Sequence, residues 1–166
     1  MNPMFSVRPA TTGDIELIRQ LTFRVWPQTY ASIISREQID YMLDMMYSPA
    51  SLEKQMNDGA RFIIAYDGDE PVGFASFQEI KPAVYKLHKL YVLTTQQGKG
   101  TGRHLVDHIC NTIKPEGAKA LQLQVNKMNK AKTFYEKIGF TVKEEMILDI
   151  GNGYVMDDYI MEKELA

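Results

Sequence analysis

The segment Gln97-Gly98-Lys99-Gly100-Thr101-Gly102-Arg103 constrains the fold more than any other part of this sequence. It follows an apolar stretch, Tyr85 to Leu93, that is typical of a strand. After it come apolar residues at helical spacing, Leu105, Val106, Ile109, Cys110 and Ile113. Glycine lets the backbone approach a ligand closely, and the start of a helix offers free N–H groups and a partial positive charge. The strand–loop–helix pattern therefore predicts a pyrophosphate-binding turn, with a merely tight turn as the alternative.

The glycine spacing does not fit the two commonest nucleotide sites. A P-loop needs four residues between its glycines and ends in Gly-Lys-Ser/Thr. A dinucleotide-binding fold places Gly-x-Gly-x-x-Gly beside the first strand. Here the order is Gly98-x-Gly100-x-Gly102, and several predicted elements precede it. A nucleotide-binding module that uses this loop alone remains the rival interpretation.

A second segment, residues 125–140 (VNKMNKAKTFYEKIGF), strengthens the interpretation of the loop as a pyrophosphate-binding turn. The two segments together resemble the signature of the general-control-type N-acetyltransferase superfamily (GNAT). Gln97, Gly100 and Gly102 match the first element of that signature. The second element is matched, with one residue fewer between Asn and Ala, by Asn129, Ala131, Tyr135, Gly139 and Phe140. Parts of the N-terminal third, Thr29-Tyr30 and 38–46, are also similar to polyamine acetyltransferases of the PaiA kind.

The resemblance implies an α/β fold made of one GNAT-type domain. Its sheet is expected to be mixed and mostly antiparallel, flanked by helices, with a splayed central pair of parallel strands. Hydrophobic periodicity agrees with helices that end at Pro27, that start at Ser35 with a capping box, and that cover 51–56. We expect acceptor-side helices in residues 1–60, an acetyl-coenzyme A core in 61–140 and C-terminal strands in 141–166.

The same resemblance implies the cofactor-binding residues. Backbone groups of the splayed strand are expected to bond the pantetheine arm, the glycine loop to hold the pyrophosphate, and an asparagine to contact the pantetheine or adenylate part. An Asn at this place can also simply cap a helix. The cofactor-binding set is Leu90, Tyr91, Val92, Gln97, Gly98, Lys99, Gly100, Thr101, Gly102, Arg103, Asn129 and Tyr135.

Tyr135 is the expected general acid, because the departing thiolate needs a proton and a Tyr at this place supplies it in the family. A core aromatic is the alternative for this residue. An incoming amine is mostly protonated at neutral pH, so a base or a water relay is needed. His88 stands where polyamine acetyltransferases use a glutamate, and Glu79 is the other candidate base. No metal is expected, and His104 and His108 are interpreted as surface histidines.

These residues predict an N-acetyltransferase that moves acetyl from acetyl-coenzyme A to a primary amine. The acceptor would be a small amine, a polyamine or a peptide N-terminus, and the amine would attack directly in a ternary complex. The alternative is a non-catalytic coenzyme A-binding regulator on the same fold, since fold does not fix function. The acceptor site is expected in the region from Trp26 to Met56, which carries aromatic and acidic side chains.

Composition excludes several other classes. The 166 residues carry a formal net charge of −2 with scattered Lys and Arg, which argues against a nucleic-acid partner. No apolar run reaches the ~18 residues of a membrane span, and the first residues do not resemble a signal peptide. One cysteine, Cys110, allows no disulfide within the chain, as is typical of a reducing compartment. We expect a cytoplasmic protein without a membrane partner, for which a homodimer is allowed.

Overall fold

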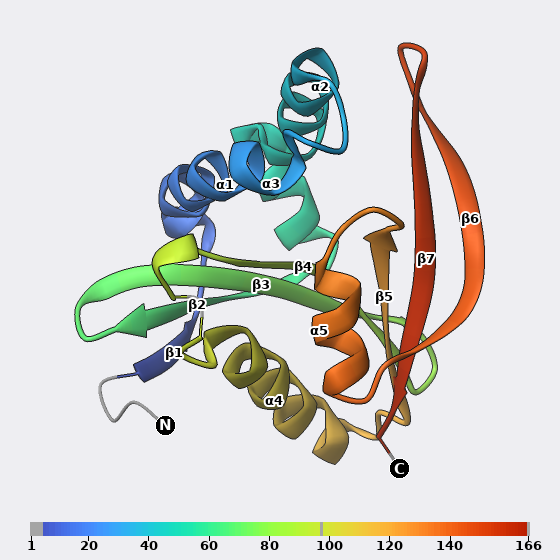
Figure 1. The fold of residues 1–166 in the computed structure, drawn as a ribbon. Coiled ribbons are helices and arrows are strands. Elements are labelled where there is room, and N and C mark those ends of the chain that lie inside the picture. The colour runs from blue at the N-terminus through green and yellow to red at the C-terminus, as the bar shows by residue number, and fades with distance from the viewer. Residues whose placement is uncertain (1–4, 97, 166) are drawn as a thin grey trace.

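The computed structural model describes residues 5–96 and 98–165. Within them the chain forms five α-helices and seven strands (Figure 1). The helices are α1 (Ile15–Tyr30), α2 (Arg36–Tyr47), α3 (Pro49–Asn57), α4 (Thr101–Ile113) and α5 (Ala131–Lys137), with short 3₁₀ turns at Thr12–Asp14, Thr94–Gln96 and Lys114–Glu116. The strands are β1 (Phe5–Pro9), β2 (Arg61–Asp67), β3 (Glu70–Lys81), β4 (Val84–Val92), β5 (Ala120–Asn126), β6 (Thr141–Gly151) and β7 (Tyr154–Glu164).

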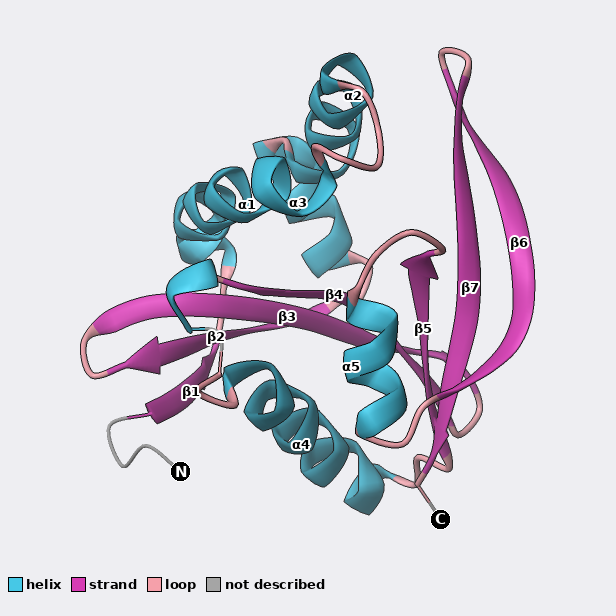
Figure 2. Ribbon diagram, viewed as in Figure 1, coloured by secondary structure: helices cyan, strands magenta, loops and turns pink. Residues whose placement is uncertain are grey.

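The strands form one sheet in the order β1-β2-β3-β4-β5-β7-β6. Only the central pair, β4 and β5, is parallel among the described strands, and every other neighbour runs antiparallel. Helices α1 to α3 cover one face of the sheet, and α4 and α5 cover the other (Figure 2). This arrangement confirms the expected mixed, mostly antiparallel sheet flanked by helices.

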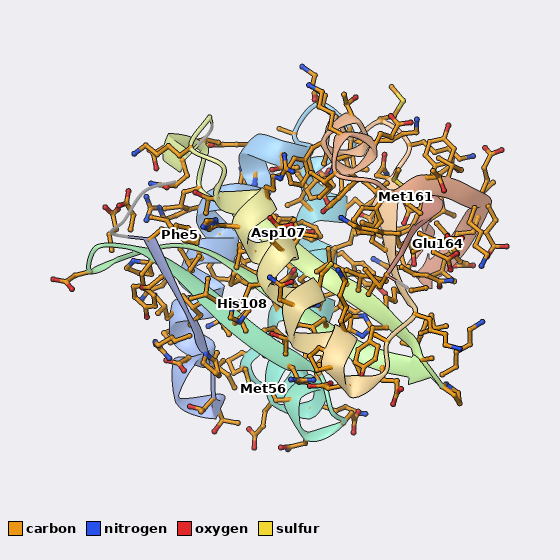
Figure 3. All side chains as sticks on the ribbon, turned by 90° about the horizontal axis from the view of Figure 1, so that it is seen from below. Phe5, Met56, Asp107, His108, Met161 and Glu164 are labelled. Carbon is orange, nitrogen blue, oxygen red and sulfur yellow. The ribbon has the colours of Figure 1, made fainter. Side chains whose placement is uncertain are left out.

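Alternation along the central strands divides the core into two layers. In β2, Phe62 and Ile64 pack with α1–α3, whereas Ile63 and Ala65 pack with α4 and α5. Successive side chains of a strand point to opposite faces, so a sheet covered on both sides needs apolar residues at consecutive positions. Seen from below, α4 crosses the sheet (Figure 3). The His104 ring in the first half of α4 contacts Phe5 of β1. The continuous apolar run at Phe62–Ala65 is therefore explained by burial on both faces.

The parallel pair opens partway along its length. Pairing runs from Val84↔Ala120 to Leu87↔Leu123 and goes no further. At the same point β4 contains a bulge: Phe77 of β3 faces Leu87, but Ser76 faces Lys89, which leaves His88 as the extra residue. A bulge increases the local twist and bends its strand. Figure 1 shows β5 running steeply away from β4, and this confirms the predicted splay.

One helix end differs from the prediction. Pro27 does not end α1, which continues to Tyr30 with the Ala31 N–H bonded to the Pro27 carbonyl. The proline ring removes one backbone donor, yet packing of α1 on the sheet keeps the helix intact beyond it. Ser35 caps α2 as predicted, at 3.1 Å from the Gln38 N–H. None of the helices in the described part of the chain is long and apolar enough to cross a membrane.

Gln38 explains the missing half of the capping box. Its side-chain amide donates to the Val155 carbonyl at 2.9 Å instead of returning to the start of its own helix. The Tyr41 hydroxyl likewise donates to the Ile150 carbonyl at 2.8 Å. These two bonds attach α2 to the tip of the β6–β7 hairpin, whose turn residues Gly151, Asn152 and Gly153 all have positive φ. The C-terminal hairpin thereby becomes a wall of the space beneath α2.

Gly73 provides a test of how closely β3 and β4 fit. A Cβ there would lie 2.8 Å from the Tyr91 carbonyl oxygen and 3.3 Å from Val92 Cα, both backbone atoms. We expect Gly73→Ala to lower the free energy of unfolding by about 1–3 kcal/mol, the usual cost of overpacking. Urea unfolding monitored by tryptophan fluorescence measures it.

Gly13→Ala is the matched control, because a Cβ at exposed Gly13 would meet only Thr11 Oγ1 at an ordinary 3.5 Å. Its free energy of unfolding should stay within about 0.5 kcal/mol of wild type. Equal midpoints for Gly73→Ala and Gly13→Ala would show that β4 yields easily at Tyr91.

Candidate active site

Two cavities adjoin at the opening between β4 and β5. The first, here called the splay cavity, has a volume of about 490 Å³ and lies between the end of α1, the separated ends of β4 and β5, and the start of α5. The second, here called the acceptor cavity, has a volume of about 440 Å³ and lies beneath α1–α3 and beside the β6–β7 hairpin. Both are lined by Tyr30, His88, Tyr91 and Gln124. The sheet is therefore open to both cavities at one place.

The predicted backbone site at Leu90–Val92 lies on one wall of the splay cavity. On its inner side this part of β4 pairs with Gly73–Ala75 of β3. On its other side the pairing with β5 has already ended at Leu87. An edge of strand backbone without a neighbouring strand can accept an extended ligand as an added strand. The geometry is therefore suited to the role that was expected for these residues.

The glycine loop ends at the N-terminus of α4. Gly98 and Gly100 have φ of 80° and 77°, and a Cβ at either would meet no atom within 4 Å. These glycines are thus required by the backbone conformation and not by crowding. The loop borders a hollow of about 300 Å³ that includes Gly100, Thr101 and Arg103. Gln97 lies outside the described residues.

Side chains around the loop fix its shape. The buried Thr101 hydroxyl donates to Gln96 Oε1 at 3.1 Å, and Gln96 Nε2 donates to Asp67 Oδ2 at 3.3 Å. Gly102 packs against α5, where an added Cβ would lie 3.2 Å from the Phe134 ring. The loop is thus joined to the residue that precedes Tyr135. The first turn of α4 presents N–H groups that no residue of the helix can accept.

The two basic residues of the loop form long ion pairs. Lys99 Nζ lies 3.7 Å from Asp67 Oδ2, and Arg103 Nε lies 3.9 Å from Asp107 Oδ2. Exposed pairs of this length contribute little to stability. Both side chains can therefore leave their partners to approach a phosphate at small energetic cost.

Asn129 closes a turn just before α5, whose N-cap position is taken by Lys130. Its Oδ1 accepts the Ala131 N–H at 2.9 Å, and it lies on the wall of the splay cavity. Asn126 makes a similar turn with the Met128 N–H at 2.9 Å but lies on the acceptor cavity. The turn uses the oxygen of the Asn129 side chain, and the amide group of the same side chain interacts with the Tyr30 hydroxyl at the wall of this cavity.

Tyr135 lies in α5 with 8% of its surface exposed, at the wall of the splay cavity. Its ring packs against Phe134 and Phe140. Among the described residues, none forms a hydrogen bond with its hydroxyl. Burial, and then the nearby Tyr30, raise the pKa of Tyr135 well above its usual value. The hydroxyl therefore keeps its proton at neutral pH and can donate it.

His88 lies at the bulge, on the wall that the two cavities share. Its Nε2 is 3.2 Å from Gln78 Oε1, a carboxamide that also donates to the Asp58 carbonyl at 2.7 Å. Loss of hydration and then the positive charges of Lys86 and Lys89 lower the pKa of His88 to about 4. The imidazole is therefore neutral at pH 7, with a lone pair that can accept a proton.

Glu79 lies away from both cavities. Its carboxylate accepts the Ala83 N–H at 3.2 Å across the β3–β4 turn. It faces Tyr85, on the side of the sheet covered by α4. Of the two bases considered from the sequence, the structure brings only His88 together with Tyr30, Tyr91 and the splay.

The acceptor cavity contains charged residues that the sequence analysis did not select. Lys86 and Lys89 flank His88 on β4, and Asp158 comes from β7. Gln124 links them, because its Oε1 accepts from Lys86 at 3.4 Å and its Nε2 donates to Asp158 Oδ2 at 2.8 Å. Polar residues within the otherwise apolar stretch Tyr85–Leu93 were a usable signal for the lysines. Asp158 gave none, because its strand is far away in the sequence.

The predicted acceptor region contributes part of this cavity. Trp26, Tyr30, Met42 and Met46 line it, and Tyr47 closes its inner end. Asp40 and Asp44 line a hollow on the outer side of α2 instead. Among the described residues, no group of three His, Cys, Asp or Glu side chains is placed to hold a metal ion.

Comparison with known proteins agrees with this architecture. A spermidine N(1)-acetyltransferase from Thermoplasma acidophilum is 27% identical over 164 residues, which are 95% of this chain and 96% of that protein. A [ribosomal protein bS18]-alanine N-acetyltransferase from Haemophilus influenzae is 33% identical over 86 residues, 51% of this chain and 58% of that one. The crystal structure of the PaiA N-acetyltransferase from Thermoplasma acidophilum in complex with coenzyme A has a TM-score of 0.82 at 25% identity, covering 96% of this chain and 98% of that one.

The family assignment follows from a match that covers most of the chain. The family model described as "Acetyltransferase (GNAT) domain" matches residues 30–161. These residues include the splay, the glycine loop and the tyrosine on α5. The chain therefore belongs to the GNAT family of acetyltransferases.

Proposed function

We propose that this protein transfers an acetyl group from acetyl-coenzyme A to a primary amine by direct attack in a ternary complex. The observation that carries the proposal is the meeting of the two cavities at the splay. A cofactor bound along the open edge of β4 can present its thioester to an acceptor that enters from the other face of the sheet. The coenzyme A bound to the PaiA relative supports the choice of cofactor.

Different groups of the protein would hold the pyrophosphate and the pantetheine arm of the coenzyme. Backbone N–H groups of Gly98 to Arg103 would bind the pyrophosphate, and Lys99 and Arg103 would add positive charge. The Leu90–Val92 backbone and the Asn129 amide would hold the pantetheine arm. Residues 61–140 thus form the cofactor core of one domain, residues 1–60 the acceptor-side helices, and 141–166 the C-terminal strands. A cytosolic location stays a prediction.

Starting from its ammonium form, the acceptor loses two protons and the coenzyme gains one. The ammonium gives its first proton to His88 or to a water beside it, and the free amine attacks the thioester carbonyl. The nitrogen of the tetrahedral intermediate gives its second proton to solvent, and the intermediate collapses as the carbon–sulfur bond breaks. Tyr135 donates its hydroxyl proton to the departing thiolate, whose ordinary pKa is near ~8.5. The products are the N-acetylated amine and coenzyme A, and solvent restores the proton to Tyr135.

The first test concerns the loop. Gly100→Ala should weaken coenzyme A binding about tenfold or more, because the methyl group enters the space beside the helix N-terminus. Gly117→Ala is the matched control: it also has positive φ, 97°, and open space for a Cβ, but lies at the far end of α4. Both should lose roughly 1–2 kcal/mol of stability. Calorimetric titration with coenzyme A measures the difference, and equal affinities would mean that the loop is only a turn.

The second test concerns the acid. Tyr135→Phe should lower kcat by roughly 10²–10⁴-fold, the usual contribution of a positioned proton donor, while coenzyme affinity changes little. Tyr85→Phe is the control, since its hydroxyl bonds Glu116 at 3.0 Å and lies outside both cavities. Thiol release with a panel of amines provides the rate. Full activity in Tyr135→Phe would assign the proton to another donor, and inactivity of the wild type toward every amine would favour a coenzyme-binding regulator.

The third test concerns the base. Since the pKa of His88 is about 4, the residue is already neutral above pH 6. His88→Gln should therefore lower kcat/KM by roughly tenfold or more at every pH between about 6 and 9 without moving the profile. The rise with pH in that range reports the acceptor losing its proton. A profile whose midpoint shifts in His88→Gln would show that His88 titrates in this range when the complex forms.

A further inference from the structure

The acceptor cavity is unusual in the charges that line it. Its charged lining residues are Lys86, Lys89, Asp58 and Asp158. Asp58 is occupied by an ion pair with Lys54 on α3, at 2.5 Å. Two lysines and one carboxylate, Asp158, therefore remain to interact with whatever enters.

Lys89 has no carboxylate within ion-pair distance among the described residues. Its ammonium lies over the Tyr47 ring, 4.8 Å from the ring centroid, and its side chain is half-buried in the cavity wall. Burial, and then the charge of Lys86, lower the pKa of Lys89 to about 8. Burial also lowers the pKa of Lys86, which donates a hydrogen bond to the neutral Gln124. A buried ammonium without a counter-ion is costly, so an anion supplied by a ligand would be bound favourably.

Asp158 complements the lysines. The residue is 1% exposed; its Oδ2 accepts from Gln124, and its Oδ1 has no hydrogen-bond donor among the described residues. A buried carboxylate oxygen without a donor costs free energy that an ammonium can recover. One cavity thus offers an acceptor for a positive group on β7 and two donors for a negative group on β4, with β5 between these strands.

We infer that the natural acceptor is of the amino-acid class, an amine that carries a carboxylate in the same small molecule. The carboxylate binds Lys86 and Lys89, and the ammonium is drawn to Asp158 before it loses its proton at the splay. This inference rests on the proposed acetyl transfer and narrows its acceptor. A polyamine fits less well, because its two or more ammonium groups would meet two lysines and a single carboxylate.

Size and polarity agree with a small acceptor. A volume of about 440 Å³ lies in the range of small-molecule sites. The remaining lining is largely apolar and includes Met42, Met46, Leu148 and Met156. An apolar amino-acid side chain would fill that part while its charged groups stay beside β4 and β7.

The test compares L-leucine, L-leucinamide and spermidine as acceptors at saturating acetyl-coenzyme A. Leucine and its amide differ only in the carboxylate. We expect kcat/KM, corrected for the fraction of free amine, to be at least about tenfold higher for leucine than for either other compound, as a charge-assisted bond predicts. Preference for leucinamide or spermidine would overturn the inference but leave acetyl transfer intact. Failure of acetyl-coenzyme A to bind would instead remove the proposed function.

Variants identify the residues responsible. Lys89→Met and Lys86→Met keep the apolar stem, so folding should survive, which thermal unfolding checks. Each should reduce the leucine-to-leucinamide ratio toward one. Lys81→Met, at an exposed lysine near the end of β3, is the matched control and should keep the wild-type ratio. A ratio that persists in both cavity variants would overturn the assignment of the anion site.

A binding measurement keeps the test independent of turnover. The reaction products N-acetyl-leucine and N-acetyl-leucinamide lack a reactive amine, and calorimetry gives their affinities. The other ionisable side chains that line the cavity are Lys86, His88 and Tyr91 on β4, Tyr30 and Tyr47 on the helices, and Asp58 and Asp158. Because the pKa of Lys89 is about 8, affinity for N-acetyl-leucine should fall as pH rises through that value, and binding should take up protons. Equal affinities for the two products, or a pH dependence that persists in Lys89→Met, would refute the proposal.

Discussion

After Leu87, β4 and β5 no longer pair, and the rest of the site depends on this loss of pairing. A parallel pair in the middle of a covered sheet is normally closed, because unpaired backbone groups are costly when buried. Here the β4 edge gives up its hydrogen bonds to β5 where His88 bulges out of the ladder with β3. The edge that becomes free is the same one that faces the splay cavity. The backbone groups of β4 that lose their β5 partners therefore line a cavity in which a ligand could bond to them.

The bulge also decides which side chains reach the acceptor. Before it, Tyr85 and Leu87 point toward α4, and Lys86 points into the acceptor cavity. After it, Leu90 and Val92 face the α4 side, whereas Lys89 and Tyr91 face the acceptor side. If His88 took a regular place in the ladder, strict alternation would place Lys89 and Tyr91 beside α4. The bulge at His88 therefore keeps both lysines on the side of the same cavity. Gly73 permits this path, since any side chain there would meet the Tyr91 carbonyl.

Local signals in the sequence predicted much of the fold. Helix spacing, the Ser35 cap and the strand before the glycine loop all depend on neighbours within a few residues, and all are found. The error at Pro27 has a tertiary cause, because packing of α1 on the sheet outweighs one missing hydrogen bond. The absence of the second capping-box bond also has a tertiary cause. The Gln38 side chain bonds instead to Val155, which is distant in the sequence.

Site residues could be predicted from the sequence where they lie in one continuous segment. They could not be predicted where the register of strand pairing brings them together. The glycine loop and Tyr135 belong to contiguous patterns, so their place beside the splay could be expected. Asp158 approaches Gln124 only because β7 pairs with β5 in one particular register, with Asp158 facing Asn126. No local pattern encodes that pairing. The same register buries Asp158 in the wall of the cavity that Lys86 and Lys89 line from β4. The charged residues of the acceptor cavity thus come together through pairing between strands, whereas the glycine loop and Tyr135 lie in segments that are continuous in the sequence.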